Sequence, residues 1–227
     1  MAIFKKQLVV SLIAMTMLYP VFFISCSGGQ NSQKTGQDTI IVKNDTSLLF
    51  DGKTLRGWEI TNFGPQGPVY VSGGEIILGM GDGGTGVTWK RDFPTTNYEV
   101  SLDAMRVEGN DFFCGMTFPV GKDPCTLIVG GWGGTTVGLS SIDGMDASEN
   151  ITTTLMKFEK KHWYHICLTV TETDIKAMID SLKVVDFKTG NNKLSIRPEV
   201  ELSKPFGIAS WNTTAAIRNI RVKRIEK

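Results

Sequence analysis

The chain has little excess charge and few of the residues that most often build metal sites. It contains 24 Lys and Arg against 23 Asp and Glu, with four cysteines and two histidines. Nucleic-acid binding needs a clustered basic face, and the one short basic run lies near the C-terminus, on an expected terminal strand. No cysteine has the Cys-x-x-Cys or Cys/His spacing of a zinc site. We therefore expect no nucleic-acid partner and no structural zinc.

The N-terminal segment has the pattern of a secretory signal. Lys5 and Lys6 precede an uncharged, mostly apolar stretch that is too short for a typical membrane span. The small Ser25 then precedes Cys26, as at the lipidation site of bacterial lipoproteins. We expect residues 1–25 to be a lipoprotein signal peptide, with Cys26 lipidated and tied to a cell-envelope membrane on the periplasmic or surface side. An uncleaved N-terminal anchor is the alternative.

The following residues divide the chain into a tether and one domain. Residues 26–44 are rich in Gly, Ser and Gln and show no apolar periodicity, which is typical of a flexible tether. Residues 45–227 have a length that suits one domain of all-β type.

Alternation of apolar and polar residues is the main periodicity of this domain. In residues 98–107 and 163–170, every second side chain is apolar, as expected of strands with one buried face. Many short strands with 25 glycines among them favour a sandwich or jelly roll over a helical fold. We therefore predict two antiparallel sheets, one of them curved with a partly exposed concave side.

Three cysteines remain beyond the N-terminal one, an odd number for an oxidising compartment. If residues 121–124 form a hairpin turn, Cys125 faces Val120 and Cys114 faces Gly131. This register places the two thiols too far apart for a disulfide. We expect small, buried, free thiols.

Residues 126–153 interrupt the alternation. Glycines crowd Trp132, and a polar, acidic stretch follows. We expect a long loop that is functional or mobile, although residues 130–134 also fit a bulge or a corner between sheets. The acidic residues fit either a solvated loop or a Ca²⁺ site; they are Asp143, Asp146 and Glu149.

The stretch LFDGKTLRGWE at residues 49–59 resembles the opening signature of the bacterial 3-keto-disaccharide hydrolase family. The similarity extends over residues 48–225. It implies the concanavalin A-like lectin/glucanase sandwich, and family 16-like glycosyl hydrolase is a common description of such proteins. The family's Asn-Ser-Gly-Ile-x-x-Arg step here reads Asn110-Asp111-Phe112-Phe113-Cys114-Gly115, which keeps Asn and Gly but lacks the Arg. The chain thus resembles a divergent member.

The resemblance implies cleavage of a sugar whose 3-hydroxyl has been oxidised to a ketone. The ketone acidifies the proton on C2, so a base can remove it and expel the C1 substituent. This route needs a carboxylate or His base, a cation to hold the enolate, and an aromatic wall for the sugar. The Glu-x-Asp-x-x-Glu and Glu-x-Asp-x-Glu strands of retaining glycosidases are absent from the sequence.

The candidate residues follow from this chemistry, and each also has a structural interpretation as a turn, core or surface residue. We expect Trp58 and Trp89 to lie in the core and Asp51-Gly52 to form a turn. The candidate catalytic residues are Asp111, Glu149 and His165. The candidate substrate-binding residues are Arg106, Asn110, Trp132, Asp143 and Trp211.

The favoured hypothesis is a lipid-anchored, extracytoplasmic protein that cleaves 3-keto-glycosides or related sugars. A non-catalytic, lectin-like carbohydrate-binding module is the main alternative, and a structural lipoprotein is a third. No cofactor is certain, and Ca²⁺ is the one metal that the sequence suggests.

Overall fold

The computed structural model describes residues 46–226. The expected signal peptide, the expected lipidation site at Cys26 and the expected tether all lie outside these residues. Within them, no helix has both the length and the apolar character needed to cross a membrane.

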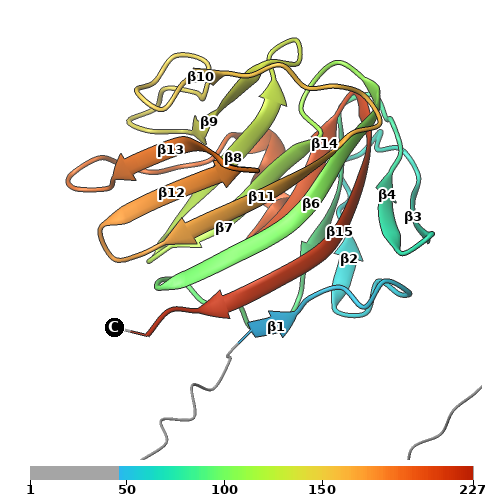
Figure 1. The fold of residues 1–227 in the computed structure, drawn as a ribbon, viewed down its shortest axis with the longest axis horizontal. Helices are drawn as coiled ribbons and strands as arrows, with labels where there is room; N and C mark the ends of the chain where they lie inside the picture. The colour runs from blue at the N-terminus through green and yellow to red at the C-terminus, as the bar shows by residue number, and fades with distance from the viewer. Residues whose placement is uncertain (1–45, 227) are drawn as a thin grey trace, which may run out of the picture. The chain divides into compact units, whose positions relative to one another are not determined.

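The described residues form two antiparallel sheets stacked face to face (Figure 1). The eight-stranded sheet has the order β13-β12-β11-β6-β15-β4-β3, with β1 paired to β15. Its strands are β1 (Thr46–Leu48), β3 (Val69–Ser72), β4 (Glu75–Leu78), β6 (Tyr98–Gly109), β11 (Trp163–Val170), β12 (Asp174–Ile179), β13 (Leu182–Lys188) and β15 (Thr213–Arg224).

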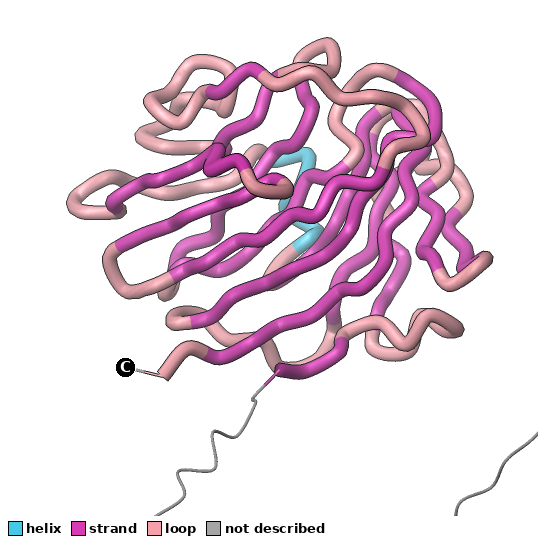
Figure 2. The backbone as a smooth tube through the Cα atoms, viewed as in Figure 1, coloured by secondary structure: helices cyan, strands magenta, loops and turns pink. Residues whose placement is uncertain are grey.

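The seven-stranded sheet lies behind it in this view, with the order β10-β9-β8-β7-β14-β5-β2. Its strands are β2 (Trp58–Ile60), β5 (Gly84–Trp89), β7 (Cys114–Val120), β8 (Asp123–Gly131), β9 (Thr136–Ser140), β10 (Thr154–Leu155) and β14 (Phe206–Trp211). One short 3-10 helix, η1 (Pro198–Ser203), precedes β14 and is drawn in cyan in Figure 2.

The core lies between the sheets and follows the predicted alternation. Tyr98, Val100, Leu102 and Ala104 of β6 are fully buried, and the inward residues of β11 are buried as well. The Tyr98 hydroxyl donates to the Pro119 carbonyl oxygen at 2.6 Å, which satisfies its polar end inside the core. The predicted all-β, two-sheet sandwich is confirmed.

The opening signature forms a structural corner. The Asp51 carboxylate accepts hydrogen bonds from the backbone N–H groups of Lys53 and Thr54, and Gly52 takes a φ of 74°. Trp58 is buried, and its indole N–H donates to the Leu49 carbonyl oxygen at 2.8 Å. The signature therefore stabilises the entry to the sandwich.

The β7–β8 hairpin corrects the predicted register. Its turn is Gly121-Lys122 alone, because Val120 already pairs with Asp123. Cys114 therefore faces Val129, and Cys125 faces Phe118. Both thiols are free and fully buried, as predicted, and burial raises the pKa of each to about 12.

The outer face of the seven-stranded sheet carries Thr, Ile and Ser side chains beside η1. Because side chains alternate along a strand, Thr126 and Ile128 of β8 and Ser140 of β9 point away from the core. Helix η1 rests on this face, where a Cβ at Gly207 would lie 2.7 Å from the Ser203 carbonyl oxygen.

Candidate functional site

A cleft of about 210 Å³ opens on this outer face beside η1. Thr126, Ile128 and Ser140 contribute sheet positions to its lining. The other lining residues come from loops, from strand ends and from the segment around η1. They are Asp111, Phe112, Trp132, Arg197, Glu199, Val200 and Trp211.

Aromatic side chains line part of the cleft. Phe112 and Trp211 have ring centroids 6.3 Å apart at an interplanar angle of 33°. Trp132 remains 42% exposed at the tip of the β8–β9 hairpin. Flat apolar faces with a polar edge are the groups that bind the faces of sugar rings. The structure thus brings the two predicted platforms, Trp132 and Trp211, to one cleft.

The glycine-rich segment around Trp132 is a hairpin and not a long loop. Most of residues 126–140 belong to β8 and β9, with a register shift between Val129 and Gly131. Of the bulge or corner considered for residues 130–134, a bulge is present at Gly130, and residues 132–135 form the hairpin turn. An irregular loop begins only after Ser140.

Arg106, a candidate substrate-binding residue from the sequence, does not reach the cleft. It neither ends β6 at the rim nor reaches across an open face, because its side chain points inward and is only 5% exposed. One guanidinium nitrogen donates to the carbonyl oxygens of Gly130 and Gly134, at 3.1 and 2.9 Å. The residue is absent from the lining of the cleft.

Asp111 lies in the β6–β7 connection and lines the cleft. Its carboxylate accepts the backbone N–H of Phe112 at 2.7 Å, and its own N–H donates to the Thr213 hydroxyl at 3.1 Å. These bonds fix a carboxylate close to the aromatic wall. Asn110 is exposed beside it and is not among the lining residues.

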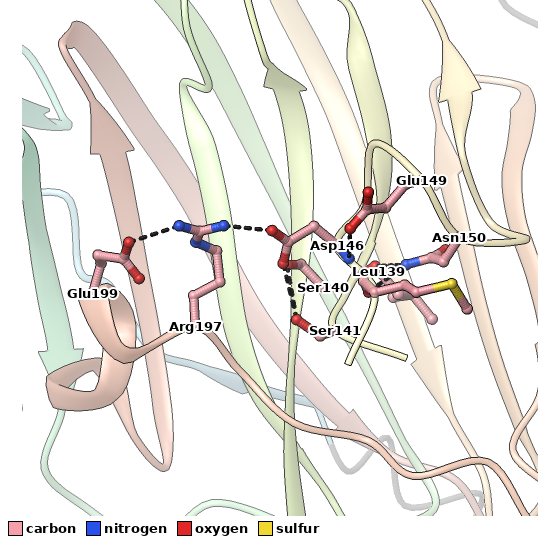
Figure 3. Close-up of polar contacts among 9 residues, drawn as sticks. Leu139, Ser140, Ser141, Asp146, Glu149, Asn150, Arg197 and Glu199 are labelled. Atoms are coloured by element: carbon pink, nitrogen blue, oxygen red, sulfur yellow. Dashed lines mark hydrogen bonds and ion pairs between the residues drawn. The ribbon is translucent and has the colours of Figure 1, made fainter. Parts of the chain in front are cut away.

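Two lining residues of the cleft, Arg197 and Glu199, belong to an ionic chain (Figure 3). Arg197 is ion-paired with Asp146 and, at 2.7 Å, with Glu199. Asp146 also accepts the hydroxyls of Ser140 and Ser141 at 3.1 and 3.0 Å. The hydrogen bond between Glu199 and Arg197 raises the pKa of Arg197 and lowers the pKa of Glu199. Arg197 therefore presents a fixed cation beside the floor residue Ser140.

The sequence did not single out Arg197 or Glu199. Both are exposed and lie in or beside the short 3-10 helix, in a segment without alternation. The one available signal is the pair of charges within Arg197-Pro198-Glu199, which is common on any surface.

The three acidic residues of the 141–153 loop do not converge. Asp143 accepts the backbone N–H of Lys193 at 2.7 Å, and Glu149 accepts that of Asp146 at 3.5 Å. Within residues 46–226, no group of three or more His, Cys, Asp or Glu side chains could hold a metal ion. The donor set therefore does not fit the suggested Ca²⁺ site. Neither Asp143 nor Glu149 lines the cleft.

His165 lies on the outer face of the other sheet. Its Nδ1 is 2.8 Å from Oδ1 of Asp103, and Oδ2 of the same carboxylate accepts hydrogen bonds from Arg218 and Asn219. The core separates this polar cluster from the cleft, because the two outer faces point in opposite directions. The structure therefore does not bring His165 together with Asp111.

The fold and the cleft define a two-sheet, lectin-like β-sandwich with an aromatic-lined site on one outer face. Solved structures of this architecture include a candidate glycosyl hydrolase from Parabacteroides distasonis, at 13% identity and a TM-score of 0.53 over 81% of this chain and 95% of that one. The carbohydrate-binding module CBM66 from Bacillus subtilis matches at 15% identity and a TM-score of 0.53, over 74% and 95%. A protein of unknown function with a galectin-like fold, from Bacillus subtilis, matches at 12% identity and a TM-score of 0.55. The match covers 76% of this chain and 91% of that one.

The family assignment is direct. The model of the 3-keto-alpha-glucoside-1,2-lyase-like domain matches residues 45–223, so the chain belongs to this family. The predicted family resemblance is thereby confirmed. A search of curated proteins returned no match.

Proposed function

We propose that this protein binds a 3-keto-glycoside in the cleft and cleaves its glycosidic bond by elimination. The observation that carries the proposal is the meeting of Asp111, Arg197 and two tryptophans in one cleft of a chain from this family. The fold relatives, among them a carbohydrate-binding module, support a sugar as the ligand.

Each group has a role in this chemistry. Asp111 is the base that takes the proton from C2 of the keto-sugar. The C1–O bond then breaks as the enolate collapses, and the departing alkoxide takes a proton from water. Arg197 supplies the positive charge near the enolate oxygen. Trp132 and Trp211 hold the ring by contact with its faces. Water then adds to the enone, which completes net hydrolysis.

A non-catalytic sugar-binding role is the second candidate. The observation in its favour is that Glu199 and Asp146 already neutralise Arg197 through ion pairs. This arrangement weakens the positive field that an enolate needs. Binding through the aromatic side chains and the floor hydroxyls requires no such field.

The test is to incubate the purified protein with a glucoside and with its 3-keto derivative, with and without a chelator. Release of the aglycone only from the keto form, in both buffers, supports elimination by the chain's own residues. Binding of sugar without release identifies a binding module. Loss of release with the chelator shows that a metal takes part.

We also propose that the domain is held at the bacterial cell envelope through a lipid on Cys26. The support is the signal-like pattern of residues 1–25 and the small residue before the cysteine. Expression with a labelled fatty acid should label the wild-type chain and not a Cys26→Ser variant. Equal labelling of both would reject the anchor.

A further inference from the structure

Arg106 is a buried cation with an unusual set of partners. It continues the inward series of β6, and its guanidinium carbon lies 5.1 and 5.8 Å from the ring centroids of Phe113 and Phe158. Within residues 46–226 it forms no ion pair, and its Nε has no hydrogen-bond partner. Burial lowers its pKa, and the nearby Asp111 carboxylate opposes this shift. Burying such a charge is costly, so the contacts that it keeps are informative.

Those contacts go to two carbonyl groups on either side of Trp132. Gly130 precedes this residue and Gly134 follows it, and both carbonyl oxygens accept from the same guanidinium nitrogen. A Cβ at Gly130 would lie 2.4 Å from that nitrogen, and one at Gly134 would lie 3.2 Å from the other terminal nitrogen. The glycines therefore allow the backbone of the turn to approach the guanidinium.

The turn itself holds a strained conformation. Trp132 has a φ of 48°, in the left-handed region that side chains rarely adopt, and Gly133 and Gly134 also have positive φ. One backbone hydrogen bond, from Gly134 N–H to the Gly131 carbonyl oxygen at 3.1 Å, closes the turn. Such a conformation persists where the surroundings fix it. Arg106 supplies two further hydrogen bonds to the turn from the core side.

We propose that Arg106 is a positioning residue that fixes the 130–134 turn and thereby holds Trp132 in the wall of the cleft. It acts from the core side and does not touch the sugar. The part of this inference that concerns sugar binding rests on the proposed function.

The first experiment needs no sugar. Amide hydrogen exchange of the full chain is compared between wild type, Arg106→Met and the control Arg218→Met, which removes an arginine from the opposite outer face. We expect exchange within residues 131–134 to accelerate about tenfold or more in Arg106→Met and to remain unchanged in the control. Unchanged exchange in folded Arg106→Met overturns the inference.

A second variant covers a failure of Arg106→Met to fold. Arg106→Lys keeps the charge, but its ammonium ends one bond short of the guanidinium nitrogen that donates to both carbonyls. Faster exchange of the turn in Arg106→Lys supports the proposal, and wild-type exchange in this variant overturns it.

The second experiment measures affinity for a 3-keto-glucoside in a double-mutant cycle. We expect Arg106→Met to weaken binding by no more than Trp132→Ala, and to add no further loss when combined with it. A further loss in the double variant shows that Arg106 does not act through Trp132. If wild type binds no sugar, the proposed function fails, while the exchange experiment still decides the role of Arg106.

Discussion

Asp146 and Arg197 form an ion pair that connects the 141–153 loop to the segment before η1, across 51 residues of chain. The same carboxylate accepts the hydroxyls of Ser140 and Ser141. One side chain therefore fixes both a floor residue and the cation of the cleft.

Replacement of this carboxylate should loosen the site. In Asp146→Asn, an amide N–H₂ faces Arg197, and hydrogen bonds to charged groups contribute about 1.5–3 kcal/mol each. We expect about 1–2 kcal/mol lower free energy of unfolding, measured with urea, together with a higher KM. The matched control is Asp186→Asn, whose partner Lys183 is exposed. There we expect a smaller loss, because solvent screens an exposed ion pair. Equal losses in the two variants would contradict a special role for Asp146.

Trp132 should contribute to sugar affinity without affecting the fold. Its exposed ring can be truncated at little cost to the core, and loss of an aromatic wall of this kind weakens binding about tenfold, or about 1.4 kcal/mol. Titration calorimetry of Trp132→Ala with the keto-sugar measures this loss. Trp163→Ala is the control, because Trp163 lies on the opposite outer face. There the guanidinium carbon of Arg218 is 3.9 Å from the centroid of the Trp163 ring. A similar loss in the control would reject Trp132 as a specific contact.

Asp111 should be needed for turnover and not for binding. Removal of a general base lowers the rate by about 10²–10⁴-fold, so Asp111→Asn should show this loss in kcat with nearly unchanged affinity for the keto-sugar. Asp103→Asn, on the other outer face, should keep the wild-type rate. Full activity in Asp111→Asn would exclude the proposed base.

The polar cluster at Asp103 should make stability depend on pH in the acid range. Burial raises the pKa of Asp103, but hydrogen bonds from His165, Asn219 and Arg218 outweigh this effect and lower it below its ordinary value of 3.8. A lowered pKa stabilises the folded state above pH 3.8, and this contribution is lost as the pH falls through the folded-state value.

The corresponding measurement is the urea midpoint at pH 7 and at several values below pH 4. We expect the midpoint of the wild type to fall more steeply in acid than that of Asp103→Asn, which has no carboxyl group to protonate there. An equal decrease of the urea midpoint in the two proteins below pH 4 would show that the cluster does not contribute to the pH dependence of stability.

Local pattern was sufficient for much of the fold. The period-two alternation of residues 98–107 and 163–170 predicted which side chains are buried, because a strand with one face on a core has no other stable arrangement. The Asp51-Gly52 turn and the buried Trp58 were also predicted from local sequence. The β7–β8 register was less accurate, because Asp123 and Pro124 have the composition of a turn but pair as the start of β8.

The site depended on contacts between distant parts of the chain. Trp132, Trp211 and Asp111 were candidates from sequence, yet Arg197 and Glu199 were not, because an irregular surface segment carries no periodic signal. Arg106 occupied an inward position of its strand, but the carbonyls that bind it lie in β8 of the other sheet and in the turn after β8.

His165 shows most clearly what local sequence pattern does not determine. Alternation placed it correctly on the less apolar side of its strand, and the structure puts it on an outer face. By itself the sequence determined which side of β6 and of β11 is buried, since that depends on neighbours two residues apart. Only the tertiary structure decided which outer face carries the cleft, because that depends on how the strands are ordered into two sheets and on where η1 and the loops come to rest.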